Sequence, residues 1–319
     1  MHPIAILGAG TMGRGIAQVF AVRGHPVRLY DPSAEALQAA LPRIRLGLEP
    51  FLQLGLHTSE EAGRCLENIA VCAEIAAACR DAPVVVEAAP EDAGLKQTLL
   101  AEAEAAAADD ALLCSNTSAL SITAMAKGLR RPERLVGTHF WNPAQIIPCV
   151  EIVRGEKTGE RTVNEARSLL EAAGKEPVLV KREVPGFLGN RLQHALQREA
   201  FYLVEQGIAS PEDVDRVVKY GFGLRYALMG PLERADLGGL DVTYAVQRTV
   251  LPDLDGRTSP SELLGRRVAA GDLGAKTGRG FYEWPPEKKE RLLGRRDLAL
   301  LGILQLARGL AAGKRPSDE

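Results

Sequence analysis

The sequence contains little that would link it to a metal ion or a membrane. Its five cysteines form no CxxC pair, and their spacing suits helix and strand positions, so we expect reduced, mostly buried thiols and no metal site. No apolar run reaches the roughly 18 residues of a membrane-spanning helix. The apolar start of the chain lacks the charged leader and cleavage site of a signal peptide. These absences predict a cytoplasmic protein with no membrane partner.

An excess of charge of one sign is also missing. The 319 residues carry a formal net charge of -2, with both signs scattered along the chain, which argues against nucleic acid as a partner. The chain is 46% hydrophobic and 25% charged, so it can build a sizeable core and has no mark of disorder. One long or two ordinary domains fit this composition, and a small-molecule substrate is the expected partner.

Short β-rich runs alternate with longer helical patterns over the first 181 residues. This alternation predicts an α/β domain in which helices cover a mostly parallel, Rossmann-like sheet. The expected strands are residues 4–7, 27–30, 84–87, 112–114, 135–137, 150–153 and 178–180. The Leu- and Ala-rich stretch 34–79, interrupted by Pro42 and Pro50, is too long for one crossover helix. We interpret it as a helical excursion from the sheet.

The pattern changes after Pro185-Gly186. From residue 187 to 207 the apolar residues recur at helical spacing, which indicates a second, helical domain. We therefore expect an N-terminal domain over residues 1–183 and a helical C-terminal domain over residues 184–319.

A glycine-rich turn follows the first expected strand and opens a helix. Gly8, Gly10 and Gly13 would provide a tight turn, close backbone approach to a pyrophosphate and close helix packing, although such turns also occur without a ligand. Asp31 stands at the end of the second expected strand, where a carboxylate accepts the ribose hydroxyls of NAD and repels the 2′-phosphate of NADP. The combination predicts an NAD site. Its expected residues are Gly8, Gly10, Thr11, Met12, Gly13 and Asp31.

A polar segment, SNTSAL at residues 115–120, directly follows the expected strand 112–114. Its hydroxyl and amide groups should emerge at the carboxyl end of that strand, which is where open α/β sheets bind ligands. The alternative is structural, because Ser118 or Ser121 could serve only as the N-cap of the next helix.

A histidine and a glutamate lie on neighbouring expected strands. Glu151 stands within an apolar run and needs a partner, and His139, at the end of the preceding strand, is a chemically natural one. Glu151 would fix the imidazole tautomer, so that His139 could take a proton from a substrate hydroxyl while hydride leaves the same carbon. A purely structural hydrogen bond between the two is the alternative.

Together these motifs resemble the L-3-hydroxyacyl-CoA dehydrogenase family over nearly the whole chain. The matching segments are GAGTMG at 8–13, EAAPE at 87–91 with Lys96, SNTSAL at 115–120, GTHFWNP at 137–143, VEIV at 150–153, VPGF at 184–187 with Asn190, GPL at 230–232, GLD at 239–241 and KTGRGFY at 276–282. Several motifs in one order are more specific than any single motif. The resemblance implies a Rossmann-like domain and a helical C-terminal domain that makes a homodimer.

The resemblance also implies roles for individual residues. His139 would be the catalytic base and Glu151 its orienting partner, while Ser118 and Asn190 would hydrogen-bond the reacting oxygen of the substrate and its neighbouring carbonyl. The residues implied at the nicotinamide and ribose end of NAD are Asn116, Glu91 and Lys96. Asn142, in the GTHFWNP motif, is a candidate substrate contact.

Two departures from the family pattern leave the substrate open. Acyl-CoA members are usually rich in lysine after the second strand, where lysines serve the CoA phosphates, whereas residues 41–65 contain three arginines and no lysine. The segment 221–230 looks more like relatives that oxidise free hydroxy acids, such as gulonate and carnitine dehydrogenases. Arg225 within it could hold a carboxylate bidentately or simply lie exposed at a helix end.

Three hypotheses follow. The first is NAD-dependent, reversible oxidation of a short-chain L-3-hydroxyacyl-CoA to the 3-ketoacyl-CoA, and the second is the same chemistry on a small free 3-hydroxy acid. The third is NAD binding without turnover, against which the pair of His139 and Glu151 argues, since an inactive protein has no need of it.

Overall fold

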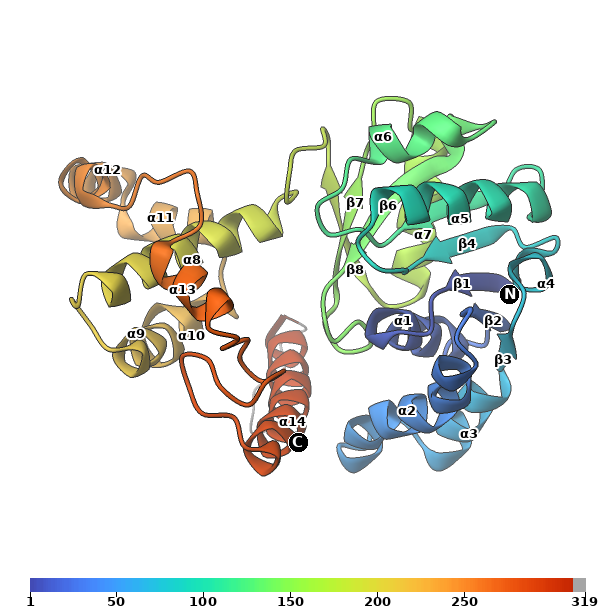
Figure 1. Ribbon diagram of the computed structural model, residues 1–319, viewed down its shortest axis with the longest axis horizontal. Coiled ribbons are helices and arrows are strands. Elements are labelled where there is room, and N and C mark those ends of the chain that lie inside the picture. Colours follow the sequence, from blue (N-terminus) through green and yellow to red (C-terminus); the bar gives the residue numbers. More distant parts are fainter. Residues whose placement is uncertain (312–319) are drawn as a thin grey trace. The chain divides into compact units, whose positions relative to one another are not determined.

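The computed structural model describes residues 1–311. The chain divides into two compact units, with the boundary between Arg191 and Leu192. The first unit is built around a sheet and the second is helical, and each is described by itself (Figure 1).

An eight-stranded sheet forms the centre of the first unit, in the order β3-β2-β1-β4-β5-β6-β7-β8. Its strands are β1 (Ile4–Leu7), β2 (Val27–Tyr30), β3 (Ile69–Cys72), β4 (Val84–Glu87), β5 (Leu112–Ser115), β6 (Leu135–Phe140), β7 (Cys149–Val153) and β8 (Glu176–Val180). All neighbouring strands run parallel except β6 and β7, which are antiparallel. The expected Rossmann-like, mostly parallel sheet is confirmed.

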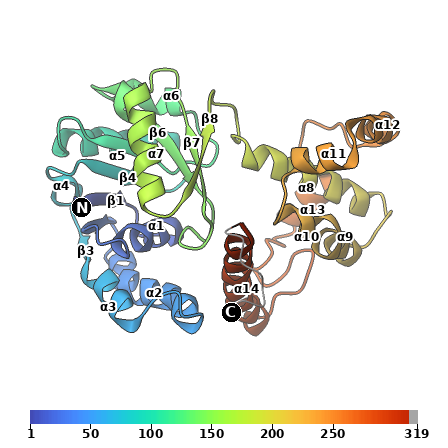
Figure 2. The same cartoon turned by 180° about the vertical axis from the view of Figure 1, so that it is seen from behind.

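Helices cover both faces of this sheet (Figures 1 and 2). They are α1 (Thr11–Ala21), α2 (Ala34–Gln53), α3 (Ser59–Glu67), α4 (Ile75–Cys79), α5 (Ala93–Ala106), α6 (Ile122–Met125) and α7 (Glu160–Ala172), with short 3₁₀ turns at Ala126–Gly128 and Pro132–Arg134. Because side chains alternate along a strand, Ile4 and Ile6 of β1 join one buried apolar cluster, while Ala5 and Leu7 join another on the opposite face. A strand buried on both faces reads as an unbroken apolar run in the sequence.

The expectation of a purely helical excursion over residues 34–79 was wrong. Ile69–Cys72 form the edge strand β3, which pairs with β2. Four residues are too few for periodicity to separate a strand from a helix, and the outward-facing Val71 is 44% exposed. Conversely, Pro42 and Pro50 do not end α2, which continues through both.

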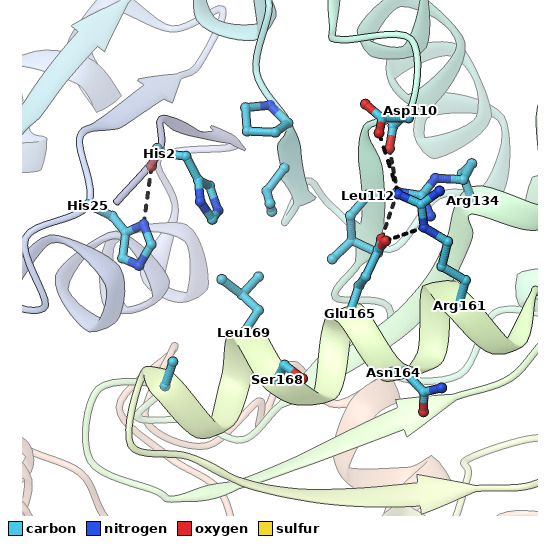
Figure 3. Close-up of a pocket in the computed structure, with 13 residues that line it drawn as sticks. His2, His25, Asp110, Leu112, Arg134, Arg161, Asn164, Glu165, Ser168 and Leu169 are labelled. Carbon is cyan, nitrogen blue, oxygen red and sulfur yellow. Dashed lines mark hydrogen bonds and ion pairs between the residues drawn. The ribbon is translucent and has the colours of Figure 1, made fainter.

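A hollow of about 880 Å³ lies at the amino-terminal ends of the strands, next to α7 (Figure 3). The imidazoles of His2 and His25 line one part of it. An ion-pair cluster lines another, where Glu165 is 2.8 Å from Arg134 and 2.6 Å from Arg161. The glycine-rich turn follows the carboxyl end of β1, so this hollow and the turn lie at opposite ends of the strands.

The cysteines are free thiols, and Cys65, Cys79 and Cys114 are buried. Burial raises the pKa of Cys65 to about 11 and that of Cys79 and Cys114 to about 12. Residues 1–311 contain no group of three side chains suited to hold a metal ion. None of the helices in this range combines the length and apolar character needed to span a membrane.

The second unit is helical, as expected. Its helices are α8 (Gly189–Glu205), whose first turn belongs to the first unit, α9 (Pro211–Val217), α10 (Gly223–Tyr226), α11 (Pro231–Gly238), α12 (Leu240–Val250), α13 (Glu262–Ala269) and α14 (Pro286–Ala311), with a π-helical turn at Val218–Phe222 and a 3₁₀ turn at Leu251–Asp253. Among residues 192–309, Leu301 is the one buried apolar side chain. This unit therefore has almost no apolar core of its own.

Candidate active site

The glycine-rich turn joins β1 to α1 in a shape that suits a dinucleotide. Gly8 has a φ of +113°, and a Cβ on Gly13 would lie 1.7 Å from the carbonyl oxygen of Gly8, so both positions require glycine. A Cβ on Gly10 would meet nothing within 4 Å, which leaves open space above the turn. No side chain caps the first turn of α1, so its N–H groups are available to a phosphate. The turn fits a pyrophosphate.

Asp31, which follows β2, stands beside this turn. Its Oδ2 accepts a hydrogen bond from the backbone N–H of Ala9 at 2.8 Å, and its Oδ1 accepts one from Ser33 at 2.9 Å. The half-buried carboxylate thus connects the turn to the loop after β2. At the start of α1, Thr11 is exposed, whereas Met12 is half-buried and packs against the apolar cluster of that face.

His139 and Glu151 form a buried pair. They face each other in the antiparallel register of β6 and β7, which places their side chains side by side on one face of the sheet. His139 Nδ1 lies 2.7 Å from Glu151 Oε2, and the two residues are 5% and 2% exposed. The expected strand 135–137 placed His139 beyond its end. In the structure β6 extends to Phe140 and includes His139.

The second oxygen of Glu151 binds the backbone where α8 begins. Oε1 accepts N–H groups of Leu188 at 2.8 Å and Gly189 at 3.0 Å. Burial alone would raise the pKa of Glu151, but the hydrogen bonds from His139, Gly189 and Leu188 outweigh it and hold this pKa below its ordinary value. An ionised carboxylate can only accept, so Nδ1 of His139 carries the proton and Nε2 is the basic nitrogen.

Two aromatic rings enclose the imidazole. The ring centroid of His139 lies 5.1 Å from that of Trp141 and 5.7 Å from that of the buried Phe187. A Cβ on Gly189 would lie 2.1 Å from the Trp141 ring, so only glycine fits there. The sequence did not predict the hydrogen bonds from the N–H groups of Leu188 and Gly189, because a backbone donor does not depend on residue type. The VPGF motif at 184–187, directly before them, was the one sequence feature that pointed to this region.

The segment after β5 carries two of the expected site residues. Asn116 is buried, and its Oδ1 accepts the backbone N–H of Phe140 at 2.9 Å. Ser118 is exposed, and its carbonyl oxygen accepts a hydrogen bond from Asn190 Nδ2 at 3.0 Å. Ser121 is the N-cap of α6, so the capping role that either serine could have had belongs to Ser121. The Ser118 hydroxyl does not cap this helix. Ser118 and Asn190 are thus neighbours.

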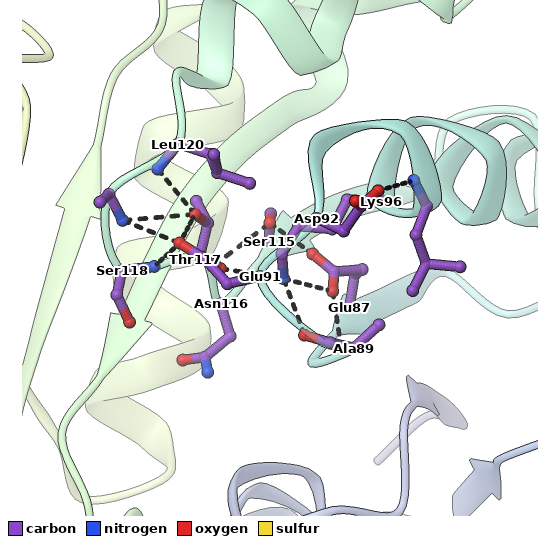
Figure 4. A network of polar contacts seen from close by, with 12 residues as sticks. Glu87, Ala89, Glu91, Asp92, Lys96, Ser115, Asn116, Thr117, Ser118 and Leu120 are labelled. Atoms are coloured by element: carbon purple, nitrogen blue, oxygen red, sulfur yellow. Dashed lines mark hydrogen bonds and ion pairs between the residues drawn. The ribbon is translucent and has the colours of Figure 1, made fainter. Parts of the chain in front are cut away.

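Glu91 and Lys96 occupy different positions (Figure 4). Glu91 is exposed and accepts the backbone N–H of Ser118 at 2.8 Å. Lys96 is only 1% exposed, and its ammonium lies 2.7 Å from a carboxylate oxygen of the fully buried Glu87. Lys96 therefore lies beneath the surface of the site.

The two candidate substrate contacts lie outside these buried networks. Asn142 is exposed beyond the end of β6. Arg225 is exposed on α10 of the second unit, and within residues 1–311 its guanidinium makes no hydrogen bond or ion pair.

Comparison with known proteins is decisive. Residues 3–184 match the model of the 3-hydroxyacyl-CoA dehydrogenase NAD-binding domain, and residues 186–284 match that of the C-terminal domain. The chain belongs to the 3-hydroxyacyl-CoA dehydrogenase family. As a member of it, the chain is an NAD-dependent oxidoreductase, and the glycine-rich turn beside Asp31 is the local structure that fits this cofactor.

Family members similar to this chain differ in the substrates that their names state. The 5-formyl-3-hydroxy-2-methylpyridine 4-carboxylate 5-dehydrogenase of Mesorhizobium japonicum is 34% identical over 96% of this chain and 98% of its own length. A probable 3-hydroxybutyryl-CoA dehydrogenase of Bacillus subtilis is 37% identical over 88% of this chain and 96% of its own length. A crystal structure of a 5-dehydrogenase of the same pyridine carboxylic acid, described as an NAD⁺-dependent dismutase, matches with a TM-score of 0.91 at 33% identity, covering 99% of this chain and 100% of the other.

Proposed function

We propose that this family member oxidises the hydroxyl group of a short-chain L-3-hydroxyacyl-CoA to the 3-ketoacyl-CoA, with His139 as general base. The observation that carries the proposal is the buried pair in which Glu151 Oε2 lies 2.7 Å from His139 Nδ1. The pair holds the imidazole in the tautomer whose Nε2 can accept a proton. The positive charge that then develops on the ring lies next to an ionised carboxylate, which stabilises it.

The remaining residues bind and orient. NAD supplies the hydride acceptor when bound, so the protein contributes position, proton transfer and exclusion of water. Ser118 and Asn190, already neighbours, are proposed to hydrogen-bond the reacting oxygen and the adjacent carbonyl of the substrate. The residues proposed to hold NAD are Gly8, Gly10, Thr11, Met12, Gly13, Asp31, Glu91, Lys96 and Asn116.

A second candidate substrate is a small free hydroxy acid. The absence of CoA is favoured by the match to the pyridine carboxylate dehydrogenases, whose named substrate is a free carboxylate with a formyl group. This match extends over 96% of this chain in sequence and 99% in structure, against 88% for the 3-hydroxybutyryl-CoA enzyme. The lack of lysine in residues 41–65 removes the usual partners of the CoA phosphates. The exposed Arg225 would then hold the substrate carboxylate, with Asn142 as a further contact.

A substrate panel separates the two candidates. NADH formation is measured with 3-hydroxybutyryl-CoA, with free 3-hydroxybutyrate and with aromatic hydroxy acids. Turnover of the acyl-CoA but not of the free acids supports the first candidate, and the reverse supports the second. Arg225→Met should raise KM only if the substrate carries a free carboxylate, by about tenfold or more. Its matched control is Arg216→Met, because Arg216 is an exposed arginine on α9 of the same unit.

We also propose that the protein is a homodimer formed through its helical unit. Leu232 on α11 is 80% exposed and Tyr244 on α12 is 67% exposed, while Leu301 is the one buried apolar side chain among residues 192–309. Exposed apolar area on this scale is characteristic of a surface that a partner covers.

A further inference from the structure

The hollow at the amino-terminal ends of the strands is separate from the candidate active site. Open α/β sheets bind cofactor and substrate at the opposite, carboxyl ends, where the glycine-rich turn lies. The volume of the hollow, about 880 Å³, is within the range of pockets that enclose small molecules. Its apolar wall consists of Pro83, Val84, Leu112, Leu169 and Ala172. The hollow thus has the size and the apolar wall of a small-molecule site.

Arg134 forms one polar end of the hollow (Figure 3). The residue is 8% exposed, and its Nη2 donates to Glu165 Oε2 at 2.8 Å and to the carbonyl oxygen of Asp110. Its Nη1 donates to the hydroxyl of Thr162 at 3.3 Å. Its Nε is buried and has no hydrogen-bond partner among residues 1–311. A guanidinium nitrogen can only donate, so this N–H requires an acceptor.

The charges at this end are balanced. Glu165 also lies 2.6 Å from Arg161, and Arg161 lies 3.6 Å from Asp110. Burial alone would raise the pKa of Glu165, but the hydrogen bonds from Arg134 and Arg161 lower it, so Glu165 is an anion. Two arginines therefore face two carboxylates. The free N–H of Arg134 suits a neutral acceptor, such as a carbonyl oxygen, because this end has no excess of positive charge.

The imidazoles of His2 and His25 form the other polar end. Their ring centroids are 4.9 Å apart. His25 Nδ1 lies 3.1 Å from the carbonyl oxygen of His2 and carries the proton, because a carbonyl oxygen only accepts. Burial and the nearby His25 lower the pKa of His2, and no carboxylate among residues 1–311 pairs with either ring. This end suits an anion, which would accept hydrogen bonds from the rings and stabilise their protonated form.

The two polar ends share one feature. His2 Nε2, like Arg134 Nε, is buried and has no hydrogen-bond partner among residues 1–311. Four buried side-chain nitrogen or oxygen atoms in this range lack a partner, and two of the four belong to residues that line the hollow. Buried polar atoms are nearly always hydrogen-bonded, and a few polar groups set in an apolar wall are characteristic of a ligand site.

We propose that the hollow is a second, non-catalytic binding site for a small organic acid that also carries a carbonyl group. The carboxylate binds the imidazoles of His2 and His25, and the apolar body packs between Leu112 and Leu169. The carbonyl oxygen accepts the free N–H of Arg134. The site is independent of the proposed function, because none of these residues belongs to the candidate active site.

The ligand chemistry is tested by calorimetric titration of the full chain with matched compounds. The probes are 6-oxoheptanoate, with an aliphatic body, and 4-acetylbenzoate, with an aromatic one. At least one of them should bind with a Kd of about 1 mM or lower. Acetophenone lacks the carboxylate and should bind about tenfold more weakly than 4-acetylbenzoate, whereas 4-ethylbenzoate lacks the carbonyl group and should bind about threefold more weakly.

Two variants test the location of the site. Leu169→Trp fills the hollow, because Leu169 is a half-buried residue of its wall, and His2→Leu removes the orphan nitrogen without altering any strand. Each should raise the Kd of the oxo acid by about tenfold or more. The matched control is Leu46→Trp, at an exposed leucine of α2, which should bind the oxo acid like the wild type. Melting temperatures close to that of the wild type show that the variants are folded.

Three results would overturn the proposal. The first is that neither oxo acid binds at concentrations up to about 10 mM. The second is wild-type affinity in folded Leu169→Trp and His2→Leu, which would assign the binding to another site, such as the candidate active site. The third is equal affinity for acetophenone and 4-acetylbenzoate, which would exclude a carboxylate site. These titrations need no turnover, so their outcome does not depend on which substrate the enzyme oxidises.

Discussion

The neighbours of His139 set the two properties of its imidazole that the proposed role as a base requires, its tautomer and its orientation. Glu151 fixes its tautomer, and the rings of Trp141 and Phe187 restrict its orientation. Replacing His139 by Gln removes the proton acceptor and keeps a polar side chain of similar reach. kcat should fall about 10²- to 10⁴-fold, while NAD affinity measured by fluorescence titration stays nearly unchanged. Wild-type turnover in this variant would exclude His139 as the base.

The ionisation of Glu151 also makes the stability of the protein depend on pH. Its pKa is depressed in the folded protein, so the stability it contributes is fully present above its ordinary value of 4.5 and is lost as pH falls through the lowered pKa. The melting temperature of the wild type should therefore fall in this acidic window. Glu151→Gln cannot titrate and should show a shallower decline, although it is less stable at neutral pH. Parallel curves of melting temperature against pH for the two proteins would contradict this.

At the scale of elements, the reversal of direction between β6 and β7 creates the site. The antiparallel register sets His139 and Glu151 directly opposite each other, so their side chains leave the same face of the sheet. The start of α8 then closes the arrangement, because its N–H groups occupy the second oxygen of Glu151. The pair of His139 and Glu151 thus depends on three elements.

Gly189 tests this dependence. In Gly189→Ala the added Cβ would lie 2.1 Å from the Trp141 ring, so the indole or the start of α8 must shift. We expect a loss of about 1–3 kcal/mol in the free energy of unfolding, measured with urea, together with a fall in kcat. Gly294→Ala in α14 is the control, since its Cβ would meet nothing within 4 Å and alanine favours helix. Equal stability of Gly189→Ala and the wild type would show that Trp141 is free to move.

At the scale of the whole molecule, the two units differ in how they are stabilised. The first has apolar clusters on both faces of its sheet, whereas the second has almost no buried apolar side chain among residues 192–309. A helical unit without a core gains too little from burial to offset the entropy of ordering its chain. Its stability must come from further apolar contacts, and in the proposed homodimer a second copy of the chain would supply them.

The oligomeric state checks this argument. Sedimentation of the wild type should give twice the mass of one chain at micromolar concentration. Replacing Leu232 and Leu237 on α11 by Glu should shift the protein towards a less stable monomer, because both side chains are more than 75% exposed in the single chain. Leu46→Glu, at an exposed leucine of α2, should remain dimeric. A monomeric wild type would contradict the homodimer.

The features that the sequence determined by itself are local. The glycine-rich turn, Asp31 and the unbroken apolar runs depend on backbone conformation and on burial of both faces of a strand, which neighbouring residues encode. Seven of the eight strands and the helical character of the second unit were accessible in this way. The order of motifs was specific enough to indicate the family and its cofactor.

The tertiary structure decided what depends on partners distant in the chain. The short edge strand β3 exists through its pairing with β2 and carries too few residues for a periodic signal. The sequence singles out Lys96 through the family resemblance, but only packing shows it enclosed with Glu87. The N–H donors of Leu188 and Gly189 reach Glu151 across more than 35 positions. Residue type says little about such contacts, because every residue except proline carries the same backbone donor.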